Sequence, residues 1–239
     1  MSVSQALEAL KRKDFAAARN FMAEEDLSAF SFQHFLIKGL SELALEEWAD
    51  ACQTFTEATK RFPDYALFWL NRGIAEENLK QIDAAIVSQE KCLALNPLQV
   101  EACGNLSNLY RVKGRFAEAE AMARRALAGV AIKADALNCL GLALDKQGEF
   151  DEARASFMQA HMIAPQNPAF LANHANLEME TFNFEEAWKL FAAARAIEDK
   201  PVFRHDEGLA RLLSGDFKRG FELFEARLEM PNMLRLIAS

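Results

Sequence analysis

Asparagine recurs at fixed positions inside stretches of helical periodicity. Asparagine has only middling helix propensity, so its recurrence at one phase of a helix needs a reason. A carboxamide offers a donor and an acceptor, so a row of them can pair with the N–H and C=O groups of an extended peptide whatever its sequence. They can equally bond to neighbouring segments of the chain or to water. The asparagines of this pattern are Asn71, Asn105, Asn108, Asn138, Asn173 and Asn176.

The spacing of these asparagines places them on one face of successive helices. Three of them share one column, two residues before a Gly, Ser or Ala, and Asn138 is one residue off, where Cys139 interrupts the column. The other two follow column members by three residues, which puts them on the same helix face. The pattern therefore predicts a polar stripe rather than isolated side chains.

No catalytic or metal-binding motif accompanies the asparagines in the sequence. The four histidines are far apart with no HExxH motif, and the glycines sit singly, without a phosphate-binding loop. The cysteines form no CxxC pair and fit reduced, buried thiols of a cytoplasmic protein. We therefore expect a chain without metal or cofactor that is not itself an enzyme. These residues are His34, His161, His174 and His205, and Cys52, Cys92, Cys103 and Cys139.

Composition narrows the classes of partner. The net charge of −8 and the pI near 5.2 repel phosphate backbones, so nucleic acid is not expected as a partner. The N-terminus has no apolar signal region, and no apolar run approaches the roughly 18 residues that a membrane span needs. The sequence thus predicts a cytoplasmic protein without membrane contact.

A repeat of 34 residues organises the chain. Alanines that follow a turn recur at this interval, and Gly220 comes 33 residues after the last of them. A small residue precedes each by twelve positions. The alanines are Ala51, Ala85, Ala119, Ala153 and Ala187, and the preceding small residues are Gly39, Gly73, Ser107, Gly141, Ala175 and Gly208.

The period predicts stacked helical hairpins. Each unit holds two helical stretches split by a short turn, and three units close on a proline that ends the second helix, at Pro63, Pro97 and Pro165. Small residues let the two helices of a hairpin approach closely, so we expect Ala153 to be buried against a first helix. One hairpin cannot bury its own apolar face, whereas stacked copies can, and the array forms a solenoid.

These motifs resemble the tetratricopeptide repeat (TPR) family. The segments "WLNRG" (69–73) and "LNCLG" (137–141) look like its first-helix signature. The resemblance implies an all-α, right-handed superhelix (α-solenoid) of about seven helical hairpins, whose first helices line a concave groove. It implies a degenerate N-terminal repeat at 1–31 and repeats at 32–65, 66–99, 100–133, 134–167, 168–200 and 201–234.

The asparagine stripe suggests a subfamily. An asparagine ladder in a TPR groove resembles the substrate-binding arm of the O-linked N-acetylglucosamine transferases, which implies a protein or peptide client. The chaperone-tail clamp is not expected, because the column of its first lysine holds no basic residue. That column reads Leu36, Leu70, Gly104, Asn138 and Ala172.

The last unit breaks the pattern at two packing positions. Gly220 replaces the turn alanine, and Arg227 stands where a small residue is expected. The segment 212–228 resembles the last repeat of bacterial proteins in which such an array precedes a glycosyltransferase domain. The resemblance implies that Gly220, Phe221, Phe224 and Arg227 dock a catalytic domain absent from this chain, with 235–239 as a truncated linker to it.

Two alternatives stay open at this stage. The last unit could be a plain solvated end cap, for which Arg227 would suffice. The chain as a whole could be a free-standing adaptor or assembly scaffold with no associated enzyme. The sequence leaves the client, the sugar and the oligomeric state open.

Overall fold

A computed structural model describes residues 3–22, 31–129 and 133–230 of the chain. These residues form fourteen α-helices and a 3-10 turn, with no strand, so the predicted all-α class is confirmed. Within these ranges no helix is long and apolar enough to span a bilayer. The proposed tail at 235–239 and the end of the last predicted repeat, from 231, lie outside the described residues.

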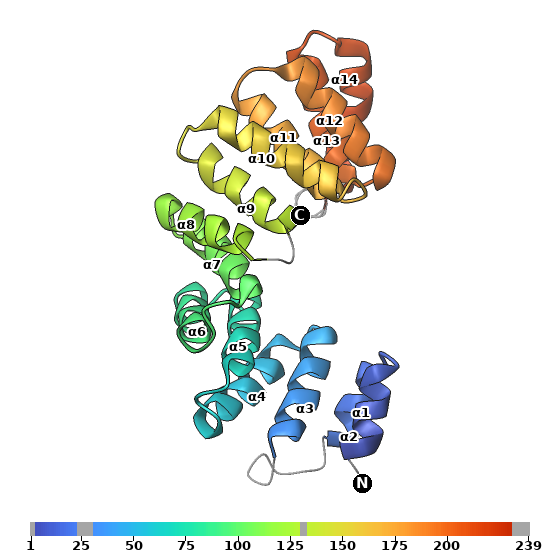
Figure 1. The fold of residues 1–239 in the computed structure, drawn as a ribbon. Coiled ribbons are helices and arrows are strands. Elements are labelled where there is room, and N and C mark those ends of the chain that lie inside the picture. The colour runs from blue at the N-terminus through green and yellow to red at the C-terminus, as the bar shows by residue number, and fades with distance from the viewer. Residues whose placement is uncertain (1–2, 23–30, 130–132, 231–239) are drawn as a thin grey trace. The chain divides into compact units, whose positions relative to one another are not determined.

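The chain divides into two compact units, Met1–Lys113 and Gly114–Ser239. In unit 1 each helix packs against the next along the chain, and alternate helices α1, α3, α5 and α7 also contact one another in turn (Figure 1). The helices are α1 (Val3–Lys11), α2 (Phe15–Met22), α3 (Phe32–Ala44), α4 (Trp48–Arg61), α5 (Ala66–Asn78), α6 (Ile82–Leu95) and α7 (Val100–Val112).

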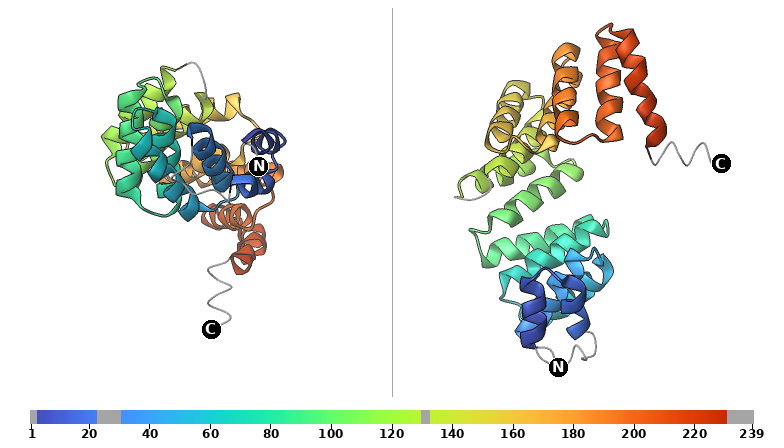
Figure 2. Two further views of the ribbon diagram at one scale, coloured as in Figure 1. Left: turned by 90° about the horizontal axis from the view of Figure 1, so that it is seen from below. Right: turned by 90° about the vertical axis from the view of Figure 1, so that its right-hand side faces the viewer.

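Unit 2 repeats the same arrangement. Successive helices again pack side by side, as the right-hand view of Figure 2 shows for the helices nearest the C-terminus. The first helices α9 and α11 touch directly. The helices are α8 (Phe116–Leu127), α9 (Lys133–Asp145), α10 (Phe150–Ile163), α11 (Pro168–Glu180), α12 (Phe184–Ile197), α13 (Pro201–Leu213) and α14 (Phe217–Phe224), followed by the 3-10 turn η2 (Glu225–Glu229).

The small-residue columns are the points where helices approach most closely. A Cβ added at Gly141 would lie 2.6 Å from the Phe157 ring, and one added at Gly73 would lie 2.5 Å from Gln89. Ala153 is fully buried in a cluster that includes Leu140 of α9. The expected burial of Ala153 is therefore confirmed, and the period of 34 reflects helix contact.

Each first helix ends in a turn that needs a left-handed residue. In α11 the N–H of Asn183 bonds to the carbonyl of Glu178 (2.8 Å), and Phe182 between them has φ of +63°. This six-to-one bond with a left-handed residue is the Schellman motif. The matching positions in the other turns are Lys13, Glu46, Lys80, Gly114, Gly148 and Gly215, all with positive φ.

The terminal hairpin corrects one expectation from the sequence. The buried small residue of the last helix is Ala226 (5% exposed), whereas Arg227 is part-exposed. The reason is that α14 ends at Phe224 and the chain continues as a 3-10 turn, whose tighter winding changes which side chain faces the hairpin. The close neighbour of Gly220 is Leu212 of its own hairpin, within 2.7 Å of an added Cβ.

Candidate functional site

A buried carboxylate recurs at one position of the first helix in three of the repeats. Glu42, Glu76 and Glu178 occupy equivalent positions on first helices, and each is at most 2% exposed. A buried carboxylate is costly unless it is paired and hydrogen-bonded. Sequence reasoning missed this column, although the same period of 34 links its members once acidic residues are aligned as well as small ones.

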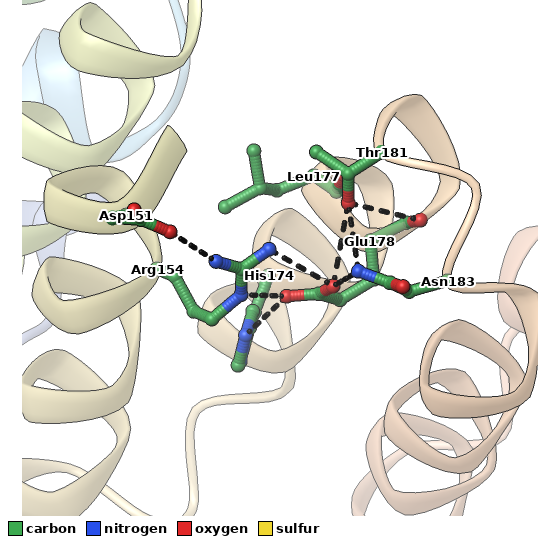
Figure 3. A network of polar contacts seen from close by, with 7 residues as sticks. All are labelled: Asp151, Arg154, His174, Leu177, Glu178, Thr181 and Asn183. Atoms are coloured by element: carbon green, nitrogen blue, oxygen red, sulfur yellow. Dashed lines mark hydrogen bonds and ion pairs between the residues drawn. The ribbon is translucent and has the colours of Figure 1, made fainter. Parts of the chain in front are cut away.

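Glu178 lies at the centre of the largest of these networks (Figure 3). Arg154 of α10 donates from Nε to its Oε1 (2.5 Å) and from Nη2 to its Oε2 (3.3 Å), a two-pronged contact between neighbouring helices. Asn183 donates to Oε2 (2.7 Å), and His174 Nε2 lies 3.1 Å from Oε1. Arg154 also bonds Asp151 through Nη1 (3.0 Å). The network fastens α10, α11 and the following turn together.

The charge states within this network follow from its geometry. Burial raises the pKa of Glu178, but hydrogen bonds from Arg154 and Asn183 outweigh burial and hold the pKa below its usual value. Burial lowers the pKa of His174, and the nearby Glu178 carboxylate offsets this only in part. The site therefore holds an ionised Glu178 beside a neutral His174 at neutral pH.

An open cleft lies over this network in unit 2. It encloses about 720 Å³ and is lined from α10, α11, the turn after α11 and the start of α12. We call it the α10–α11 cleft. Its wall is apolar at Met158 (51% exposed) and Phe182 (78% exposed), and Phe184 meets Phe182 edge-on at 6.0 Å. Its lining thus combines the exposed apolar side chains of Met158 and Phe182, the apolar rim, with the exposed carboxylates of Glu185 and Glu186, the acidic rim.

Two of the predicted groove asparagines come together in unit 2. Asn173 of α11 donates from Nδ2 to Oδ1 of Asn138 on α9 (2.8 Å). With this bond formed, the Nδ2 donor of Asn138 and the Oδ1 acceptor of Asn173 remain for a partner. If the oxygen and nitrogen positions of both amides were exchanged, the pair would still offer one donor and one acceptor. The pair thus bridges adjacent repeats and still presents peptide-like hydrogen-bonding groups.

The other asparagines do not join this pair. Asn71 is 8% exposed and donates to the Leu67 carbonyl of its own helix (2.8 Å). Asn105 is part-buried, and its Nδ2 is buried without a hydrogen-bond partner in the described structure. Asn108 is part-buried on the same helix, α7, and Asn176 is exposed on α11. The stripe is therefore an interacting pair in unit 2 and separate side chains in unit 1.

The predicted docking residues differ in accessibility. Phe221 is 59% exposed and Gly220 is buried. The Phe224 ring stacks on His205 (4.9 Å) and carries the Arg227 guanidinium at 4.5 Å from its centre. Phe221 is thus the freely accessible member of this set, together with Phe217 (63% exposed) one turn earlier.

The described part of the chain contains no set of side chains that could bind a metal ion. No group of three or more His, Cys, Asp or Glu side chains there could hold an ion. Burial raises the pKa of the Cys92 thiol to about 11, so this cysteine stays protonated at neutral pH. The chemistry that the site offers is hydrogen bonding and apolar contact.

Stacked hairpins with a fixed period place the chain among helical-repeat proteins. Sequence models described as "Tetratricopeptide repeat" match residues 38–97, 100–129 and 134–167. The chain belongs to the tetratricopeptide repeat family. Helices α11–α14 lie beyond these matches but keep the small residues and left-handed turns of the pattern.

Relatives of known structure share the fold. PilW, described as a widely conserved type IV pilus biogenesis factor, has a TM-score of 0.75 at 22% identity, over 83% of this chain and 94% of its own. A tetratricopeptide repeat protein from Parabacteroides merdae reaches 0.78 at 15% identity, over 96% and 91%. YrrB, described as a TPR protein with an unusual peptide-binding site, has a TM-score of 0.55 at 20% identity, over 79% and 98%.

One curated relative also matches. The general transcriptional corepressor trfA of Dictyostelium discoideum is 22% identical over 134 residues. The match covers 55% of this chain and a tenth of the corepressor's length.

Proposed function

We propose that this chain is a protein-binding module that holds an extended segment of a partner along its first helices. The observation that carries the proposal is the Asn138–Asn173 pair. It offers one donor and one acceptor from neighbouring repeats, which matches the alternation of C=O and N–H groups on an extended backbone. Asn176, exposed three residues after Asn173, extends the polar face by one turn.

The backbone is the part of the client that this arrangement favours. A carboxamide does not distinguish client side chains, so the pair supports binding of many sequences with modest affinity for each. The predicted groove residues of unit 1, Asn71, Asn105 and Asn108, lie outside this pair, so the proposal rests on unit 2. YrrB, a TPR protein described as having a peptide-binding site, provides a precedent for this use of the fold.

A selection of peptides tests the proposal without a known client. Random peptides displayed on phage are selected against the chain, and the winners are synthesised and measured by calorimetry. Loss of two hydrogen bonds in Asn138→Ala/Asn173→Ala should weaken binding by about 1–3 kcal/mol, roughly five- to 150-fold. The paired variant Gln5→Ala/Gln53→Ala on other surfaces is the control. Equal affinity of the peptides for the asparagine variant and the parent contradicts the proposal.

Two settings would use such a module. One is presentation of an acceptor protein to a bacterial glycosyltransferase domain, which the resemblance of 212–228 favours, with Phe217 and Phe221 as exposed docking side chains. The other is a free-standing adaptor, which the same groove serves equally well. Addition of the glycosyltransferase domain should protect amides of 212–230 from hydrogen exchange in the first setting. Unchanged protection favours the adaptor.

A further inference from the structure

The α10–α11 cleft departs from its own repeat pattern at two positions that line it. Met158 corresponds to Thr56, Glu90, Arg124 and Ala192 in other second helices, and Phe182 corresponds to Lys, Glu or Gly in other turns. Both side chains line the cleft and both are more than half exposed. Each leaves most of its apolar surface in water, and two such side chains lining one cleft favour a binding function.

Phe182 is held in an unfavourable conformation. Its φ of +63° is rare for a bulky residue, and Gly148 and Gly215 fill the same turn position elsewhere in unit 2. Glycine adopts this conformation without a Cβ clash. Phe182 therefore occupies a position where the fold alone favours glycine, and its ring lies on the surface rather than in the core.

The charge around the cleft defines the partner's chemistry. Arg154 is already engaged by Glu178 and Asp151, and Lys189 by Glu185 (3.0 Å). Four carboxylates of the cleft and its margin face these two cations, so the rim carries excess negative charge. Three of the carboxylates have side chains more than half exposed to solvent: Asp151, Glu185 and Glu186.

We propose that the α10–α11 cleft is a second protein-docking site, which takes a segment of a partner protein bearing a large apolar side chain next to Lys or Arg. The apolar side chain packs between Met158 and Phe182, and the flexible thioether adapts to its shape. The basic neighbour lies over the acidic rim at Glu185 and Glu186. This site is distinct from the asparagine face, since neither Asn138 nor Asn173 lines the cleft.

The matched variant takes its residues from the chain's own repeats. Met158→Thr/Phe182→Gly installs the residues found at Thr56 and Gly148, so it removes the apolar rim without placing a foreign residue in the fold. Phage-displayed random peptides are selected on the parent after depletion on this variant. The expected winners carry Leu, Met or Phe beside Lys or Arg, and they lose at least about tenfold in affinity on the variant.

Three further measurements decide the outcome. The winners should bind Asn138→Ala/Asn173→Ala as tightly as the parent, and Glu185→Gln/Glu186→Gln should weaken them more at low salt than at high salt. Far-ultraviolet circular dichroism should show equal helicity in all variants. The proposal is overturned if depletion leaves no enriched peptide, if the winners carry acidic flanks, or if the asparagine variant abolishes their binding.

Discussion

Unit 1 contains a counterpart of the α10–α11 cleft, built at the same repeat positions from different side chains. It lies between α4 and α5, encloses about 490 Å³, and is lined by Cys52, Thr56 and Gln81 where the other cleft has Arg154, Met158 and Asn183. Lys80 takes the turn position of Phe182, also with positive φ. The same backbone scaffold thus carries two clefts that differ at matched positions, with Thr56 and Lys80 in unit 1 where unit 2 has Met158 and Phe182.

The buried carboxylates under the two clefts are satisfied differently. Glu76 bonds Arg72 of its own helix (2.7 Å) and Ser88 (2.6 Å). Glu178 instead takes its cation, Arg154, from the preceding helix. The buried acid therefore has the same position in both repeats, whereas its cationic partner comes from the same helix in one repeat and from the preceding helix in the other. The scaffold is set by the repeat, and the chemistry of each cleft is set by the residues that depart from it.

The largest expected effect comes from removing the cation that joins α10 to α11. Arg154→Ala leaves Glu178 buried with only neutral partners, which should cost about 3–5 kcal/mol of unfolding free energy. Cys52→Ala, at the same position of unit 1, should cost about 1 kcal/mol or less. Urea unfolding followed by circular dichroism measures both. Equal losses would show that the two clefts do not differ in this way.

The pH dependence of stability separates two acids of the buried column. The pKa of Glu178 is lowered in the fold, so its ionised form stabilises the protein above the unfolded value near 4.3, and this contribution is lost as pH falls. Glu178→Gln should therefore cost about 1.5–3 kcal/mol at pH 7 and less at acid pH.

Glu42 should behave in the opposite sense. Burial raises its pKa, hydrogen bonding by Thr54 offsets this in part, and its Oε2 lacks a hydrogen-bond partner among the described residues. The folded state thus disfavours its charge, and the penalty disappears as pH falls below the unfolded pKa. Glu42→Gln should leave stability unchanged or higher at pH 7, measured by thermal unfolding across pH. A loss as large as that of Glu178→Gln would contradict the assignment.

Transfer of the apolar rim tests whether side chains alone distinguish the clefts. Thr56→Met/Lys80→Phe places the rim residues of the α10–α11 cleft at their equivalent positions in unit 1. A second copy of a peptide selected for the α10–α11 cleft should then bind to the unit 1 cleft of the same chain. Its affinity should be within about two orders of magnitude of that of the first site. Calorimetric stoichiometry measures this. An unchanged stoichiometry means that the rim residues are insufficient.

A modest effect is expected at the turn itself. Phe182→Gly removes a bulky side chain from a left-handed position and should stabilise the fold by about 1 kcal/mol. Lys80→Gly in unit 1 is the matched control and should gain a similar amount. Thermal unfolding at neutral pH measures both variants. A loss of stability in Phe182→Gly alone would show that the ring contributes to packing.

Sequence periodicity predicted the hairpins because helix contact restricts residue size. An added Cβ would collide at the column glycines Gly73 and Gly141, and Ala153 is fully buried, so the columns predicted both contacts. The burial of Ala226 instead of Arg227 could not be predicted from the sequence, because it depends on a local change to 3-10 winding. Met158 and Phe182 were detectable as departures from the period. The pairing of Glu178 with Arg154 was not, because it joins separate helices.

The asparagine pair offers the most direct test of the proposed function. Side-chain amide resonances of Asn138 and Asn173 can be followed in the 15N-labelled chain while one of the phage-selected peptides is added. We expect both side-chain amides to shift and to saturate at the concentration that calorimetry gives for binding. If the peptide binds while both amides stay unchanged, the asparagines do not contact the client and the proposed groove is contradicted.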